Sequence, residues 1–206
     1  MHKKNIIYSG KAVVEADKAL IMLHGRGGSA EDILSLSSYL EVEGFALLAP
    51  QATNHSWYPH SFLVPPAQNE PWLSSALQWL NEIEQDLNAK GIPSDKIYFL
   101  GFSQGACLSL EYTTRNAKKY GGVVAFTGGL IGDKLYTENY QGDFEKTPVF
   151  IGTSDPDPHV PVERVEASAE MIQKMNADTT VKIYKDRGHT ISQQEVDIVN
   201  QLIFGQ

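Results

Sequence analysis

A pentapeptide of sequence GFSQG, at positions 101–105, places a serine two residues away from a glycine on either side. An apolar run at 97–100 precedes it, and a helix-forming stretch at 106–112 follows it. This order predicts a strand, a sharp turn and a helix, with Ser103 at the apex. Glycine suits the flanking positions because β-carbons there would clash where strand and helix pass each other. The Ser103 hydroxyl would stand clear of the sheet at a helix N-terminus, which favours developing negative charge, so the segment predicts a nucleophile.

The composition argues against several classes of partner. The chain of 206 residues carries 17 Lys and Arg against 25 Asp and Glu, a formal net charge of −8, with no basic stripe, so we expect no nucleic-acid partner. The apolar runs are too short to span a bilayer, so we expect no integral membrane contact. The single cysteine, Cys107, allows no intramolecular disulfide and fits a reducing compartment, which predicts a cytoplasmic protein. The length, without repeat or linker, predicts a single domain over 1–206.

Short apolar runs alternate with helical patterns along the chain. Strands are predicted at Ala19–Leu23, 46–49, 97–100, 123–126, 149–151 and 181–184. Helices are predicted at 29–40 with Ser29 as the N-cap, at Trp72–Ala89, after Ser103, at 162–176 and from 193. Strands separated by helices predict the α/β class, with a mostly parallel central sheet and helices on both faces.

The predicted nucleophile needs a base and an acid, and in such sheets reactive groups gather at the carboxyl ends of the strands. His189 follows a predicted strand through a glycine-containing loop. It would take the proton from Ser103 and return it to the leaving group, while a carboxylate would hold the imidazole tautomer. Asp155 and Asp157 both follow the preceding strand, and their spacing alone does not decide between them.

Other residues of the same types are interpreted as structural. Asp186 would have to fold back on its own loop to reach His189, so we predict a turn or surface residue. His24 precedes a glycine-rich loop and is expected to hold that turn by hydrogen bonding. His55 and His60 lie five residues apart without a third ligand, so we predict no metal site.

Three further residues are predicted to have no catalytic role. His2 is expected at a frayed end, and His159 is expected on the surface of a loop. Cys107 lies one turn into the helix after Ser103, so we predict a buried side chain that packs in the core and is not the nucleophile.

Several motifs occur together in one known family. They are LHG at 23–25, GIPSDKI at 91–97 leading into GFSQGA at 101–106, DPDPHVP at 155–161, and GH at 188–189 followed by QE at 194–195. With these motifs the chain resembles the phospholipase/carboxylesterase branch of the α/β-hydrolases, which includes bacterial carboxylesterases and acyl-protein thioesterases. The resemblance covers the chain from about residue 20 onward and implies an α/β-hydrolase fold. It also implies that the acid is Asp157, directly before Pro-x-Val-Pro, and that Asp155 shapes the loop.

Ester chemistry also requires two backbone N–H groups aimed at the oxygen of the tetrahedral intermediate. Gln104, the residue after the predicted nucleophile, supplies one. The resemblance implies that the second comes from Arg26, which follows His-Gly. The family often has an apolar side chain at this position, so Arg26 is a departure from the pattern. We favour a side chain that faces solvent or makes a structural pair. The alternative is that it selects a negatively charged substrate.

The segment 51–70 is irregular and rich in proline and aromatic residues. We predict a lid-like loop over the site, in which Trp57 and Phe62 form an apolar wall for an acyl chain or an aromatic acid. The alternative is that these residues only seal a long loop to the sheet.

Together these residues predict a serine carboxylesterase that works through an acyl-enzyme intermediate with a Ser-His-Asp triad and needs no metal or organic cofactor. The expected partner is a small-molecule ester or thioester, and a homodimer is left open. One alternative is an acyl-protein thioesterase or lysophospholipase with a long-chain acyl pocket. A second is a non-catalytic binding protein on the same scaffold, against which the complete set of Ser103, Asp157 and His189 argues.

Overall fold

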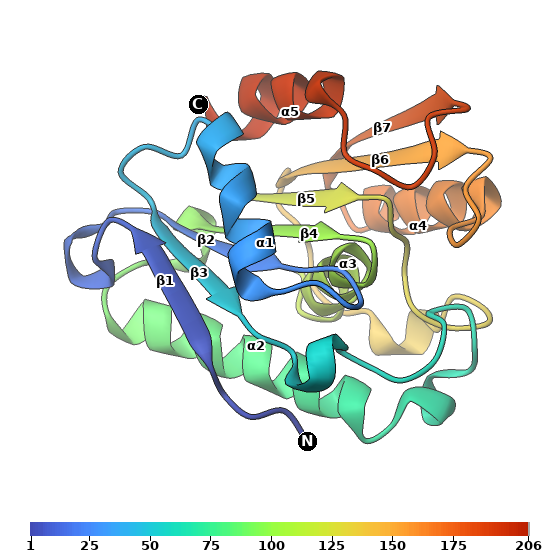
Figure 1. The fold of residues 1–206 in the computed structure, drawn as a ribbon, viewed down its shortest axis with the longest axis horizontal. Helices are drawn as coiled ribbons and strands as arrows, with labels where there is room; N and C mark the ends of the chain where they lie inside the picture. The colour runs from blue at the N-terminus through green and yellow to red at the C-terminus, as the bar shows by residue number, and fades with distance from the viewer. Residues whose placement is uncertain (206) are drawn as a thin grey trace.

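The computed structural model describes residues 1–205, which form a seven-stranded sheet covered by helices (Figure 1). The strands lie in the order β1-β3-β2-β4-β5-β6-β7. Their bounds are β1 Ile6–Gly10, β2 Ala19–Leu23, β3 Ala46–Pro50, β4 Ile97–Phe102, β5 Gly122–Phe126, β6 Pro148–Asp155 and β7 Asp178–Lys185. All neighbouring pairs are parallel except β1 with β3. The predicted α/β class with a mostly parallel sheet is therefore confirmed.

The first strand is the one that the apolar pattern did not predict. Ile6 and Ile7 are half-buried and the other three residues of β1 are exposed, because this strand pairs only with β3 at the edge of the sheet. An edge strand with one neighbour lacks the continuous apolar run of a strand covered on both faces. It therefore leaves a weak signal in the sequence.

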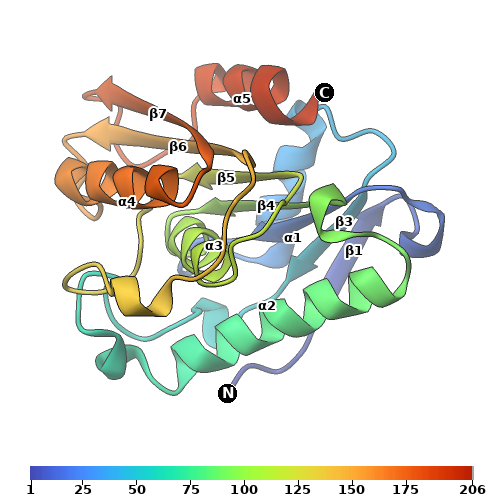
Figure 2. The same ribbon diagram turned by 180° about the vertical axis from the view of Figure 1, so that it is seen from behind.

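Helices cover both faces of the sheet, as Figures 1 and 2 show from opposite sides. One face carries α2 (Trp72–Ala89), α3 (Gln104–Arg115) and α4 (Val162–Lys174), and the other carries α1 (Ala30–Ser35) and α5 (Gln193–Val199). Ser29 caps α1 as predicted, in a capping box with Asp32. The predicted helix to Leu40 is shorter than expected, because the chain tightens into a 3-10 turn at Leu36–Tyr39.

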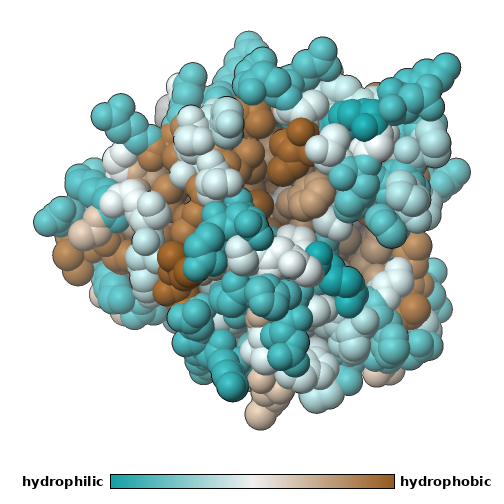
Figure 3. Space-filling model, viewed as in Figure 1, coloured by the Kyte–Doolittle hydropathy of each residue, from teal (hydrophilic) through white to brown (hydrophobic). Residues whose placement is uncertain are grey.

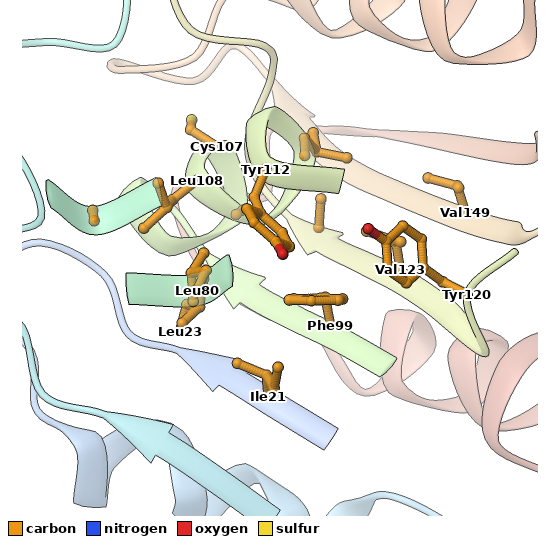
Figure 4. Packing of buried hydrophobic residues seen from close by; sticks show 14 of the residues in the cluster. Ile21, Leu23, Leu80, Phe99, Cys107, Leu108, Tyr112, Tyr120, Val123 and Val149 are labelled. Atoms are coloured by element: carbon orange, nitrogen blue, oxygen red, sulfur yellow. The ribbon is translucent and has the colours of Figure 1, made fainter. Parts of the chain in front are cut away.

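The central strands are apolar throughout because each of their faces packs against a separate core. Ile21, Phe99 and Val123 belong to the larger core beneath α2 and α3, where Leu80 and Tyr112 belong to the same cluster (Figure 4). The neighbouring residues Leu20, Leu100 and Val124 belong to the core under α1 and α5, together with Ile33 and Val196. This arrangement fixes the register of the strands, because a shift by one residue would exchange the two cores.

The segment between β3 and α2 is irregular, as predicted, apart from short 3-10 turns at Thr53–His55 and Pro66–Asn69. Within residues 1–205, no helix is both long and apolar enough to cross a membrane.

Candidate active site

The turn between β4 and α3 holds Ser103 in a strained backbone conformation, with φ 54° and ψ −116°. A β-carbon added at Gly101 would lie 2.2 Å from the carbonyl oxygen of Gly105, and one added at Gly105 would lie 2.1 Å from that of Leu23. Only glycine fits at either position. The backbone N–H of Ser103 donates to the carbonyl of Phe126 at 2.9 Å, so β5 holds the apex in place.

Three side chains from three loops form a hydrogen-bonded row at this turn. The Nε2 atom of His189 lies 2.8 Å from Oγ of Ser103, and its Nδ1 atom lies 2.8 Å from Oδ2 of Asp157. The carboxylate can only accept, so Nδ1 carries the proton and Nε2 is free to accept from the Ser103 hydroxyl. The side chain of Asp157 is fully buried, whereas that of His189 is 20% exposed and open to a substrate.

Hydrogen bonds orient the carboxylate of Asp157. Its Oδ1 atom accepts the backbone N–H groups of His159 at 2.8 Å and of Val160 at 2.9 Å. Burial raises the pKa of Asp157, but the hydrogen bonds from His159, His189 and Val160 outweigh burial and hold the pKa below its usual range. The carboxylate therefore stays ionised opposite the imidazole.

The structure brings Asp157, and not Asp155, to the imidazole. Asp155 ends β6 with its side chain exposed, and its carbonyl accepts the N–H of Asp186 at 2.9 Å. Asp186 is exposed with φ 52°, the geometry of the predicted turn residue. Gly188, directly before His189, donates its N–H to Oγ of Ser154 at 2.9 Å, and this bond fixes the loop that carries His189.

His159 was expected on the loop surface, and it is exposed, but it also lies at the site. Its ring stands edge-on to that of His189, with 5.1 Å between the centroids. The ring of Phe102 also lies against that of His189, with 5.2 Å between the centroids. Sequence reasoning missed this placement, although the position of His159 two residues after Asp157 was a usable signal.

Arg26 and Gln104 lie beside the row. Both line the same cavity as Ser103 and His189, and Gln104 is the first residue of α3. Among the hydrogen bonds of residues 1–205, none comes from the backbone N–H of Arg26, so this group is available to an oxygen atom in the cavity.

A family model for phospholipase/carboxylesterase proteins matches residues 4–204. The chain belongs to the phospholipase/carboxylesterase family. A crystal structure of a phospholipase/carboxylesterase from Dyadobacter fermentans is 57% identical in sequence, covers 98% of this chain and 97% of that chain, and superposes with a TM-score of 0.97. The fold is therefore that of the α/β-hydrolases.

Two fungal relatives named acyl-protein thioesterase 1 are more distant. The protein from Kluyveromyces lactis is 27% identical over 208 residues, which cover 91% of each chain. The protein from Gibberella zeae is 30% identical over 125 residues, and this match spans 60% of the present chain and about half, 53%, of that relative. Enzymes of these names are hydrolases.

In this member of the phospholipase/carboxylesterase family, the side chain of Arg26 binds the irregular segment. Its Nη1 donates to Oγ of Ser56 at 3.0 Å and to the carbonyl of Pro59 at 2.9 Å, and its Nη2 donates to the carbonyl of His60 at 2.6 Å. The predicted structural pairing is thus present. The contact joins the loop after β2 to the segment whose residues 58–63 line the cavity.

The side chain of Gln104 holds the same segment from the other side. Its Oε1 accepts the backbone N–H of Trp57, and its Nε2 donates to the carbonyl of Tyr58, both at 2.8 Å. The prediction that Trp57 forms the substrate wall is wrong about its position. Trp57 is fully buried, donates its indole N–H to the carbonyl of His24 at 2.9 Å and packs against Trp79, because the indole finds both an apolar shell and an acceptor there.

Two other histidines support this arrangement. His24 accepts the N–H of Ala52 at 3.1 Å through Nε2 and donates to the carbonyl of Gly25 at 2.7 Å through Nδ1, so its predicted role in the turn is confirmed. His2 is not at a frayed end, because it is buried and its Nε2 donates to the carbonyl of Trp57 at 3.0 Å. Burial lowers the pKa of both imidazoles.

The cavity has a volume of about 720 Å³. Phe62 lies in its wall, as predicted for this side chain, together with Leu63 and Val160. An adjoining groove of about 320 Å³ runs between α1 and the loop before α5, on the face where Figure 3 shows brown apolar side chains exposed among hydrophilic ones.

Cys107 lies on α3 (Figure 4) and is among the residues that border the cavity. Its thiol is buried, and burial raises its pKa to about 12. It is therefore a thiol and no thiolate at neutral pH. Within residues 1–205, no group of three or more His, Cys, Asp or Glu side chains is arranged to hold a metal ion.

Proposed function

We propose that this protein is a serine hydrolase that cleaves carboxylic esters through an acyl-enzyme intermediate. The observation that carries the proposal is the continuous row of hydrogen bonds from Ser103 through His189 to the ionised Asp157. A row in this order transfers the hydroxyl proton to an imidazole whose opposite nitrogen is held by a carboxylate.

The proposed reaction has two halves. Oγ of Ser103 attacks the carbonyl carbon while Nε2 of His189 takes the hydroxyl proton, and the alcohol leaves with that proton when the tetrahedral intermediate collapses. Water then attacks the acyl-enzyme, gives a proton to Nε2 and releases the carboxylic acid, and the proton returns to Ser103. Asp157 stabilises the imidazolium in both halves.

The backbone N–H groups of Gln104 and Arg26 are the proposed donors to the oxyanion. Gln104 begins α3, so its N–H points out of the helix N-terminus with the favourable end of the helix dipole. These groups, with the three side chains, supply what ester hydrolysis requires without a cofactor.

The proposed substrate is a small-molecule ester or thioester, and the segment 51–70 is the proposed cover of the site. The names of the fungal relatives support a second candidate, an acyl-protein thioesterase with a long-chain acyl pocket. Both activities use the same acyl-enzyme chemistry, and they differ in the acyl group that must fit the cavity beside Phe62 and Val160.

A fluorophosphonate probe tests the nucleophile. We expect the wild-type chain to be labelled covalently and Ser103→Ala to remain unlabelled, with similar thermal unfolding curves for both. Absence of labelling in the folded wild-type chain would instead favour a non-catalytic binding protein.

A series of 4-nitrophenyl esters from acetate to palmitate, followed by matched acyl thioesters, tests the substrate class. Activity confined to short acyl groups would rule out the long-chain alternative. Higher kcat/KM for palmitoyl thioesters than for short esters would favour it over the carboxylesterase.

A further inference from the structure

The charged residues that line the cavity beside Ser103 differ in sign from the net charge of the chain. The chain as a whole carries a net charge of −8. Yet the described residues that line the cavity include the basic residue Arg26 and three histidines, His60, His159 and His189, and no Asp or Glu. Asp157 lies behind His189, with its side chain fully buried. Among the described residues that line the cavity, Arg26 is therefore the one whose side chain carries a fixed charge, and that charge is positive.

The guanidinium of Arg26 has no acidic partner within ion-pair distance in residues 1–205. Its three acceptors, in Ser56, Pro59 and His60, are all neutral oxygens. The acid that lines the adjoining groove, Asp32, uses its carboxylate in the capping box with Ser29. The positive charge of Arg26 is thus uncompensated.

Part of the guanidinium is also free to bind. A guanidinium has five N–H groups, and the contacts of Arg26 use two on Nη1 and one on Nη2. The Nε–H and the second Nη2–H have no protein acceptor in the described chain. These contacts hold the side chain in one orientation, so less rotamer entropy remains to be lost when a ligand binds.

We propose that the cavity selects esters that carry a carboxylate group, which binds to the free N–H groups of Arg26 while the scissile carbonyl lies at Ser103. A carboxylate matches the guanidinium in charge and can accept two parallel hydrogen bonds, which a neutral acyl chain cannot. The inference rests on the proposed esterase function and names its substrate class.

The test compares two esters with the same leaving group and the same acyl length. They are 4-nitrophenyl hydrogen adipate, whose acyl chain ends in a carboxylate, and 4-nitrophenyl hexanoate, whose chain ends in a methyl group. We expect the wild type to prefer the adipate about tenfold in kcat/KM, after subtraction of spontaneous hydrolysis, which is the size of one charge-assisted hydrogen bond. The preference should shrink as salt is raised from 0.01 to 1 M.

Two substitutions at one position separate charge from the structural contact. Arg26→Gln keeps a donor for the segment 56–60 but removes the charge, so the ratio of the two kcat/KM values should fall about tenfold. Arg26→Lys keeps the charge and should retain part of the preference. The control is Lys96→Gln, which removes a positive charge at the opposite end of β4 and should leave the ratio unchanged.

A wild-type ratio of one or below, or a ratio unaffected by Arg26→Gln, would overturn the inference. If neither ester is hydrolysed and the fluorophosphonate does not react, the proposed function fails by itself. Titration calorimetry with adipate then still decides on the anion site. Binding that is lost in Arg26→Gln supports the site, and no binding to the wild type refutes it.

Discussion

The backbone N–H of Trp57 donates a 2.8 Å hydrogen bond to the side-chain Oε1 of Gln104, the residue that follows the predicted nucleophile. Through Nε2 the same amide also binds the carbonyl of Tyr58. One side chain therefore satisfies both backbone groups at the point where the segment 51–70 passes the turn. The part of the cavity wall that includes Tyr58 is therefore positioned by the turn that carries Ser103.

Replacement of Gln104 by methionine tests this dependence. Methionine preserves the length of the side chain but leaves the Trp57 N–H and the Tyr58 carbonyl without partners, which costs about 1–3 kcal/mol for each buried group. We expect a lower free energy of unfolding in urea and a raised KM, because the part of the cavity wall that includes Tyr58 is displaced. Unchanged stability and an unchanged KM in Gln104→Met would show that the amide is dispensable.

The two aspartates of the β6 loop provide a matched pair for the acid. Asp157→Asn should reduce kcat by about 10⁴-fold, as in other triads, because an amide disturbs the tautomer of His189. Asp155→Asn should leave kcat within a few-fold of the wild type, because Asp155 is exposed and does not contact the imidazole. Steady-state kinetics of both variants on one ester decide the matter, and the reverse order of effects would transfer the role to Asp155.

The sequence was sufficient to predict the strand-turn-helix at Ser103 because the steric demand of that turn is local and falls on two glycines. It also predicted that His189 would lie near Ser103, since the carboxyl ends of parallel strands meet at one edge of the sheet. It could not choose the acid from spacing, because the choice depends on N–H groups of His159 and Val160 that orient Asp157 only in the folded loop.

The residues that were misplaced are those whose surroundings come from distant parts of the chain. Trp57 was predicted at the cavity because it lies in the covering segment, yet its partners His24 and Trp79 belong to other elements. His2 was predicted to be frayed because it is near the N-terminus, yet it lies against Trp57 and Trp72. Contacts of such sequence separation leave no pattern in a local window.

Burial of His2 and His24 predicts that the fold loses stability in mild acid. Burial lowers the pKa of both side chains, so below about pH 6.5 the unfolded chain binds protons that the folded chain does not. The free energy of unfolding should therefore fall as the pH decreases from 7.5 to 5.5.

His2→Leu removes one of these groups along with its hydrogen bonds. The variant should be less stable than the wild type at pH 7.5, and the difference in stability between the two proteins should narrow at pH 5.5. Thermal unfolding of both proteins across this pH range tests the prediction, and a stability difference that does not change with pH would contradict it.

Cys107 should be unreactive in the folded protein. Its thiol is buried and burial raises its pKa to about 12, so almost no thiolate is present at pH 8. We expect 5,5′-dithiobis(2-nitrobenzoic acid) to react slowly with the native chain and at once with one thiol in guanidinium chloride. Cys107→Ala should retain esterase activity, and a loss comparable with that of Ser103→Ala would contradict the assignment of the nucleophile.

The loop that carries His189 is anchored by an ion pair between Arg187 and the buried Glu195 at the start of α5. Glu195 also accepts the N–H of Ser192 in a capping box, so one carboxylate fixes both the loop and the helix. Glu195→Gln should leave Arg187 without a counter-charge and lower the free energy of unfolding by about 3 kcal/mol. It should also reduce kcat more than it raises KM, because a displaced His189 receives the proton of Ser103 less well while the apolar wall with Phe62 and Val160 is intact.

A double-mutant cycle separates the ion pair from the loss of either side chain alone. If the pair acts as a unit, Arg187→Gln combined with Glu195→Gln should destabilise the protein less than the sum of the two single changes. Strict additivity in urea unfolding, with kcat unaffected in all three variants, would mean that the loop of His189 is held by other contacts. The N–H of Gly188, which donates to Oγ of Ser154, is the contact that would then remain to hold it.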